Sequence, residues 1–184
     1  VAHIAGVGDD LRERGPRQAG FDVPYSTSSV CRFDGGIADN VVPEEAHFTY
    51  EFRDLPGSDV AAWQQRVLQG AAALEPAMKA VAPDSGFRFD AIAAMPAFQA
   101  RPDEPAVQLA QRLAGTRRTT LVAFGTEAGL FKNAGIPTVV CGPGYIVQAH
   151  QPDEFVSLDQ LGRCEAFMRG LACTGTIDPA GAPE

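Results

Sequence analysis

The sequence HFTYEFRDLPGSDVAAWQQRVLQ, residues 47–69, contains two apolar patterns in succession, with a spacing that changes from two to about 3.6 residues. Residues 47–53 alternate, which predicts a strand with aromatic side chains on one face and polar ones, ending in Arg53, on the other. A Pro-Gly turn follows, and Ser58 or Asp59 is expected to cap a long amphipathic helix. The apolar stripe of that helix consists of Val60, Trp63, Val67, Leu68, Ala71 and Leu74.

The residues on either side continue the pattern of strands and helices. Upstream, residues 1–14 predict a helix, and residues 26–33 predict a strand that ends at an Asp-Gly-Gly turn. Downstream, residues 87–93 alternate and predict a third strand. This order predicts a ferredoxin-like βαββαβ sandwich, an α+β arrangement, with its first strand expected upstream of Val1.

Beyond residue 101, short apolar segments alternate with amphipathic ones, which predicts part of a parallel or mixed α/β sheet. The expected elements are a helix at 105–113, a strand at 119–123, a helix at 127–134, a strand at 138–141 and a helix at 158–171. We therefore expect two domains, residues 1–100 and 101–173. The Gly-, Ala- and Pro-rich tail at 174–184 is expected to be disordered.

Composition restricts the classes of partner. The net charge of −8 argues against nucleic acid or an anionic membrane, because a polyanion is repelled at long range. No apolar run approaches the roughly 20 residues that span a bilayer. The four cysteines are widely spaced without an apolar leader, so neither a zinc ribbon nor a secreted disulfide framework is indicated. A cytoplasmic protein that binds small molecules or other proteins is expected.

His150 is the best candidate for a metal ligand among the three histidines. It lies in CGPGYIVQAHQPDE, residues 141–154, a loop that follows a short apolar segment, and open α/β sheets bind ligands in such loops. Imidazole there could bind a metal or polarise a carbonyl, although a surface loop histidine fits the pattern equally well. His47, on the polar face of its strand, and His3, in a first helical turn, are assigned no role.

Four further positions are candidates for binding a substrate. In FGTEAG, residues 124–129, Gly125 and Thr126 begin a helix, where free backbone amides can bind a carboxylate, although capping alone explains Thr126 equally well. Arg53 can hold a carboxylate with two hydrogen bonds, and Asn40 can donate to a carbonyl oxygen. The alternatives are a surface salt bridge for the arginine and a turn residue for the asparagine.

Taken together, these segments resemble the M20 family of metallopeptidases and deacylases, and its acetylornithine deacetylase branch in particular. The resemblance covers most of the chain up to about residue 171, and its blocks follow the family's order. The matching segments are GGIADNVVP at 35–43, EFRDLPG at 51–57, FGTEAGLF at 124–131, GIP at 135–137, CGPG at 141–144 and AHQPDE at 149–154.

The resemblance implies a protomer of two domains that hydrolyses the amide of an N-acyl amino acid. Residues 1–100 would be a lid that also forms a homodimer, and residues 101–173 the last part of a catalytic α/β domain with two zinc ions, or cobalt in their place. N2-acetylornithine, in arginine biosynthesis, is the expected substrate. From their positions in the matching segments, the resemblance implies that His150 is the last zinc ligand. It implies that Asn40 and Arg53 are lid residues that reach the substrate. Gly125 and Thr126 would belong to the loop around the carboxylate of the substrate.

Other family motifs have no counterpart in these 184 residues. These are the H-x-D ligand segment, the bridging aspartate, the paired glutamates that include the general base, and a histidine of the lid. We therefore expect the base and the other ligands upstream, and this chain alone to be inactive. Because the absence of the first strand would leave backbone groups and apolar side chains exposed, we also expect this chain to associate or aggregate. The alternatives are a non-catalytic dimerisation remnant, or a deacylase for another N-acyl amino acid such as succinyl-diaminopimelate.

Overall fold

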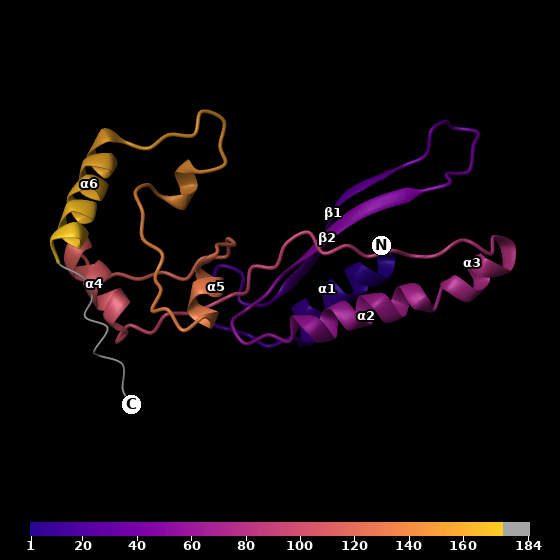
Figure 1. Ribbon diagram of the computed structural model, residues 1–184, viewed down its shortest axis with the longest axis horizontal. Helices are drawn as coiled ribbons and strands as arrows, with labels where there is room; N and C mark the ends of the chain where they lie inside the picture. The colour runs from indigo at the N-terminus through magenta and orange to yellow at the C-terminus, as the bar shows by residue number, and fades with distance from the viewer. Residues whose placement is uncertain (175–184) are drawn as a thin grey trace. The chain divides into compact units, whose positions relative to one another are not determined.

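The computed structural model describes residues 1–174, which form two compact units. Unit 1 comprises Val1–Gln99 and Thr120–Leu130, and unit 2 comprises Ala100–Thr119 and the described part of Phe131–Glu184. The tail expected to be disordered lies, apart from Thr174, outside the described residues. The elements are α1 (Ala2–Arg14), β1 (Thr27–Gly35), β2 (Ala46–Arg53), α2 (Val60–Ala72), α3 (Glu75–Val81), α4 (Pro105–Ala114), α5 (Ala128–Asn133), the 3-10 helix η1 (Ile146–Gln148) and α6 (Leu158–Cys173) (Figure 1).

Unit 1 contains the predicted hairpin, β1 paired antiparallel with β2 from Thr27 opposite Arg53 to Gly35 opposite Ala46. The register shifts between Val30 and Arg32, where β1 has one extra residue. Such a bulge reverses the alternation of faces beyond it. It therefore brings Phe33, like Val30 before it, onto the face of the strand that carries the aromatic residues of β2.

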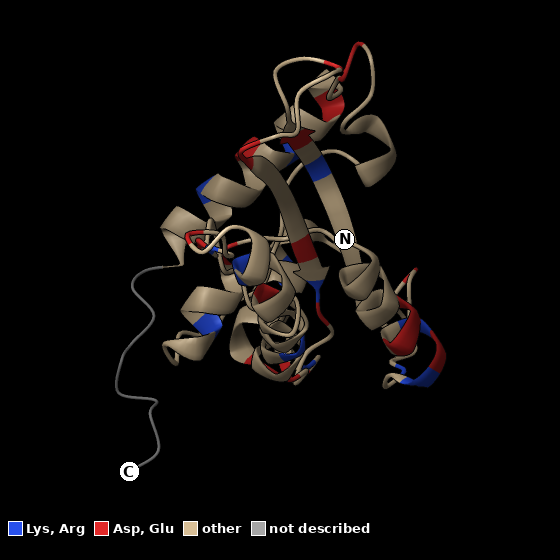
Figure 2. Ribbon diagram, turned by 90° about the vertical axis from the view of Figure 1, so that its right-hand side faces the viewer, with Lys and Arg blue, Asp and Glu red and all other residues tan. Residues whose placement is uncertain are grey.

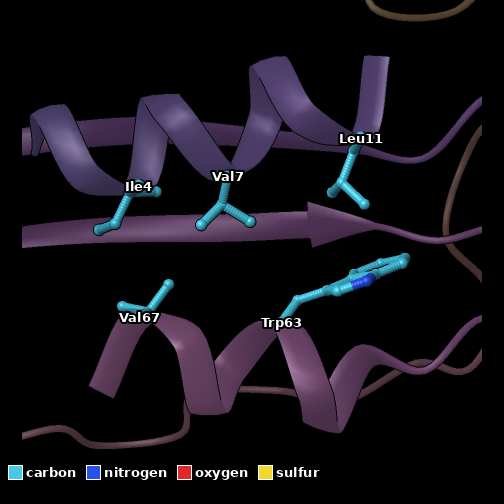
Figure 3. Close-up of a cluster of buried hydrophobic side chains, with 5 residues drawn as sticks. All are labelled: Ile4, Val7, Leu11, Trp63 and Val67. Atoms are coloured by element: carbon cyan, nitrogen blue, oxygen red, sulfur yellow. The ribbon is translucent and has the colours of Figure 1, made fainter. Parts of the chain in front are cut away.

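The core of unit 1 lies between this aromatic face and two helices. Figure 3 shows the apolar side chains of α1 and α2 pointing toward one another beside the hairpin. The fully enclosed members are Ile4, Val7, Leu11, Trp63 and Val67, with exposures of 1 to 8%. Aromatic contacts continue from the hairpin into this core, with the rings of Phe52 and Trp63 5.7 Å apart between centroids. The predicted helices at both ends of the hairpin are confirmed.

The helix after the hairpin is shorter than its apolar stripe predicts. Asp59 caps it by accepting a hydrogen bond from the Ala62 backbone nitrogen at 3.0 Å, as expected. It ends at Ala72, and the separate helix α3 begins at Glu75. Pro76 explains the break, because its ring would clash with the carbonyl four residues earlier in a continuous helix but is tolerated in a first turn.

The predicted third strand at 87–93 is wrong: within residues 1–174 the only strands are β1 and β2. The segment is irregular, although Phe89 still packs against the core of unit 1 and its ring stacks on that of Phe87. A strand is defined by hydrogen bonds to a neighbour, and no described strand lies beside this segment. The described residues thus form a mixed α/β structure with one hairpin, and the four-stranded sandwich stays a prediction.

Unit 2 is built from helices and loops. Helices α4 and α6 match the predictions, and the side chain of Leu113 in α4 approaches the backbone of α6 at Gly170. The short strands predicted at 119–123 and 138–141 are wrong, because neither segment has a described strand to pair with. The buried residues of the described part of unit 2 are Glu104 and Val107.

Charged side chains pair mostly with close neighbours in sequence. Positions of Lys and Arg are interspersed with those of Asp and Glu along the ribbon in Figure 2. Helical ion pairs four residues apart include Lys79 with Glu75, Arg163 with Asp159 and Arg169 with Glu165.

Among the described helices, none is both long and apolar enough to cross a membrane.

Candidate functional site

Arg53 ends β2 on the polar face of the hairpin, opposite to the face that α1 and α2 cover. Its Nε donates to Oε1 of Glu51 at 2.8 Å, and its Nη1 donates to the backbone carbonyl oxygen of Ala123 at 3.2 Å. The side chain remains 56% exposed. The guanidinium is thus held from two directions while part of it faces solvent.

The contact to Ala123 brings the end of β2 to the segment that contains Gly125 and Thr126. Thr126 is half-buried, and its Oγ1 accepts a hydrogen bond at 2.9 Å from the backbone nitrogen of Ala128, the first residue of α5. Helix α5, which follows, has six residues. So short a helix has a weak dipole, and any binding of a carboxylate here depends on Arg53 more than on the helix.

A second connection holds the same segments together. Asp54 Oδ2 accepts from the Ala97 nitrogen at 3.3 Å. The adjacent Pro96 carbonyl lies so close to Gly129 that a Cβ there would overlap with it. Gly129 is therefore required at the start of α5 for the chain to approach residues 96–97, which fixes the turn around Thr126 relative to the end of β2.

Asn40 lies at the opposite end of the hairpin from Arg53. It is exposed in the turn that connects β1 to β2, where the Val41 nitrogen donates to the Ala38 carbonyl oxygen at 3.3 Å. At about 3.3 Å per residue, the length of β2 alone separates its two ends by about 23 Å. Asn40 and Arg53 of one chain are therefore too far apart to contact the same small molecule, whereas Arg53 contacts the segment that leads to Thr126.

His150 belongs to unit 2, in the loop between η1 and α6. The residue is exposed, and its backbone is left-handed at φ 57°. Its backbone nitrogen donates a hydrogen bond to Oε2 of Glu154 at 3.0 Å. Asp153 is left-handed as well, at φ 59°. Residues other than glycine adopt this conformation rarely and at some cost, often at functional positions.

The described residues do not fit a zinc pair. Among residues 1–174 no three His, Cys, Asp or Glu side chains gather closely enough to hold a metal ion. The remaining histidines have other contacts: Nε2 of His3 donates to the Arg66 carbonyl oxygen at 2.9 Å, and Nε2 of His47 lies 3.3 Å from Glu45 Oε2. We therefore derive no catalytic step through a metal from this chain.

Sequence reasoning missed the groups that fix Arg53. Glu51 could have been found, because residues two apart in a strand share a face. The Ala123 carbonyl could not, because a backbone acceptor distant in sequence leaves no pattern. The contact of His3 with α2 was missed for the same reason.

Unit 2 contains a charged pair that the sequence did not indicate. The Glu104 side chain, 10% exposed, pairs with Lys132 and accepts from the Arg101 nitrogen at 2.9 Å. These hydrogen bonds, the backbone one first and that from Lys132 second, hold the pKa of the Glu104 carboxyl below its usual range. The pair anchors the start of α4 to the end of α5.

Comparison with known protein families identifies the class. The model of the peptidase dimerisation domain, M20_dimer, matches residues 3–79, which include α1, the hairpin, α2 and most of α3. Together with the relatives described next, this match shows that the chain belongs to the M20 family.

The individual relatives described here are named acetylornithine deacetylases. The chain is 32% identical over 156 residues to the acetylornithine deacetylase of Myxococcus xanthus, an alignment that covers 81% of this chain and 38% of that protein. It is 32% identical over 159 residues to the acetylornithine deacetylase of Salmonella arizonae and 31% identical to that of Erwinia tasmaniensis, with 85% of this chain and 39% of each relative aligned. The chain thus spans about two fifths of the length of these relatives.

Proposed function

We propose that this chain is part of a deacylase that removes the acetyl group from N2-acetylornithine in arginine biosynthesis. The observation that carries the proposal is the hydrogen bond from Arg53 to the Ala123 carbonyl, which joins two segments that resemble substrate-binding segments of the family. The relationship to acetylornithine deacetylases over more than four fifths of the chain supports the same activity.

The proposed role of this region is to hold the substrate's α-carboxylate. An arginine with part of its guanidinium free binds a carboxylate through two parallel hydrogen bonds. That guanidinium donates to the Ala123 carbonyl, and the backbone around Gly125 and Thr126, two to three residues further along, is proposed to supply further polar groups. Held by its carboxylate, an N-acyl amino acid would present its amide to a hydrolytic centre in a fixed orientation, which lowers the barrier to reaction.

The hydrolytic centre itself is proposed to include zinc, or cobalt, with His150 as one ligand. The other ligands and the general base are proposed to lie outside these residues, and the described residues form no cluster that could hold a metal ion. If held by His150 and those further ligands, divalent metal ions would supply hydroxide at neutral pH. The 184-residue chain alone is therefore proposed to be inactive.

The proposed lid is a ferredoxin-like sandwich in residues 1–100. A strand beside β2 would be antiparallel to it. It would pair the backbone groups on the outer edge of β2, which face no described strand. The same domain is proposed to form a homodimer in the cytoplasm, as the name of the matching family model suggests.

The proposal is tested with the polypeptide encoded by the whole gene, by measuring zinc content and N2-acetylornithine hydrolysis. His150→Ala should lower activity by at least about 100-fold, since even partners of metal ligands are worth about 10- to 100-fold. His47→Ala, a change of another exposed histidine, serves as the control and should leave activity within about twofold of wild type. Equal activity in both variants would contradict the role of His150.

The role of Arg53 is tested in the same assay. Arg53→Ala should raise KM by about 100-fold, because a carboxylate loses a charged pair worth about 3 kcal/mol. The matched control is Arg88→Ala, which removes an arginine that also pairs with an acid two residues away. An unchanged KM in Arg53→Ala would refute the carboxylate site.

A dimerisation module without catalysis is the second candidate. One observation favours it: unit 1 has its own core, formed by the same residues that match the dimerisation-domain model. If the whole-gene polypeptide dimerises but binds no zinc and hydrolyses no N-acyl amino acid, including succinyl-diaminopimelate, this function replaces the deacylase.

A further inference from the structure

We propose that Glu51 is a positioning residue for Arg53, which holds the guanidinium so that a ligand carboxylate meets it through Nη1 and Nη2. This inference rests on the proposed function of Arg53 and adds the residue that orients it. Glu51 itself would not touch the ligand.

The hydrogen bonds of the guanidinium define the proposal. Arginine has N–H groups at three nitrogens, and a carboxylate binds two of these nitrogens along one edge. Nε is taken by Glu51 at 2.8 Å, and one N–H of Nη1 by the Ala123 carbonyl at 3.2 Å. Within residues 1–174, Nη2 has no partner. The edge that includes Nε is therefore blocked, and the edge between Nη1 and Nη2 remains for a ligand.

The local structure explains why Glu51 can do this. Glu51 and Arg53 are two residues apart in β2, so both side chains project from the polar face of the hairpin. A long arginine side chain on such a face ordinarily samples many rotamers, and ordering it upon binding costs conformational entropy. A glutamate that already holds Nε removes part of this cost before the ligand arrives.

An ordinary surface ion pair would explain the same distance but predicts a different outcome. Both side chains are about half exposed, and such pairs contribute little to stability. Loss of Glu51 should thus leave the folded state intact while affecting the binding of carboxylates. The comparison pair Arg88 and Asp90 has the same two-residue spacing and the same Nε hydrogen bond, at 3.0 Å. It provides a control in which no positioning role is proposed.

The first experiment observes Arg53 directly by NMR, in the whole-gene polypeptide labelled with 15N-arginine. The Arg53→Lys variant lacks the Arg53 signal and therefore assigns it. The Nε–H signal of Arg53 should be protected from solvent exchange in wild type and in Glu51→Gln, whose amide oxygen can still accept the hydrogen bond. Protection should fall about tenfold in Glu51→Ala, which has no acceptor. Equal protection in wild type and Glu51→Ala overturns the proposal, whatever the enzyme hydrolyses.

The second experiment measures hydrolysis of N2-acetylornithine by the same variants. Glu51→Ala should raise KM about tenfold with kcat within about twofold, Glu51→Gln should restore KM to within about threefold, and Asp90→Ala should match wild type. An unchanged KM in Glu51→Ala overturns the positioning role. A wild-type enzyme that hydrolyses no N-acyl amino acid refutes the proposed function instead, and the exchange experiment then decides the role of Glu51 alone.

Discussion

The two units of this chain differ in how their helices are stabilised. In unit 1, α1 and α2 bury five large side chains against the aromatic face of a hairpin. In unit 2, the 16 residues of α6 include none that is buried, and large apolar side chains such as Phe155 and Leu158 are 64 and 85% exposed. Unit 1 thus contains a core of its own, although it also exposes Ile37 and Val42, whereas the described helices of unit 2 bury only Val107 among their apolar residues.

This difference suits the two units to different roles in the proposed deacylase. A unit with its own core can present Arg53 on a rigid strand, and a rigid support is what a binding side chain needs. Helix α6 has instead a complete set of local signals, with Ser157 and Gln160 forming a capping box at its start. Such signals determine where a helix begins without supplying the apolar contacts that stabilise it.

The largest expected effect concerns the mass of the isolated chain. Exposed apolar side chains of unit 2 and the outer edge of β2 should cause the 184-residue chain to associate. Light scattering coupled to gel filtration should give a mass at least about twice that of one chain. A single, monodisperse monomer would contradict the contrast between the units.

A change in the core of unit 1 should have the largest effect on the free energy of unfolding. Trp63 is 8% exposed between the helices and the hairpin, so Trp63→Ala should cost about 3–5 kcal/mol. Urea unfolding followed by far-UV circular dichroism measures this. The control, Leu158→Ala in α6, should stay within about 0.5 kcal/mol of wild type. Similar losses in the two variants would show that unit 2 is as well packed as unit 1.

Removal of a helix cap should affect the stability of unit 1 and unit 2 differently. Asp59→Ala removes the cap of α2 and should lower the stability of unit 1 by about 1 kcal/mol. Trp63, the single tryptophan, reports this transition by fluorescence. Ser157→Ala removes the corresponding cap of α6 and should leave the tryptophan transition unchanged while helix content falls. A shift of the fluorescence transition in Ser157→Ala would mean that the units unfold together.

The smallest expected effect is on the acid stability of unit 2. Because hydrogen bonds lower the pKa of Glu104 in the folded state, its contribution is present above the ordinary value of 4.5 and is lost as the pH falls through the folded pKa. Helix content of the wild type should therefore fall more steeply with acid than that of Glu104→Gln. Parallel acid titrations of the two proteins would exclude this contribution.

Sequence periodicity correctly predicted the helices, whose hydrogen bonds are local, and the two strands of the hairpin, which are close to each other in sequence. Both strands of the hairpin, the cap at Asp59 and the helices α1, α4, α5 and α6 agree with the structure. The strands expected at 87–93, 119–123 and 138–141 do not, because a strand needs a neighbour that periodicity cannot supply. The bulge in β1 and the break before Pro76 depend on single residues within otherwise regular patterns.

For the candidate site, residue type indicated Arg53 and Thr126 but not their arrangement. The link between them is a backbone carbonyl 70 positions away from the arginine, which no spacing rule predicts. His150 was singled out by its loop, and the structure adds its left-handed backbone. Its role as a ligand stays a prediction, since its partners are not among the described residues.

The most direct test of the account compares zinc content and N2-acetylornithine hydrolysis of this 184-residue chain with those of the whole-gene polypeptide, with zinc or cobalt added to both. We predict two bound ions and turnover for the whole-gene polypeptide, and neither for the isolated chain. Tight binding of two ions with turnover by the isolated chain would contradict the account, because its ligands and base would then have to lie within these residues.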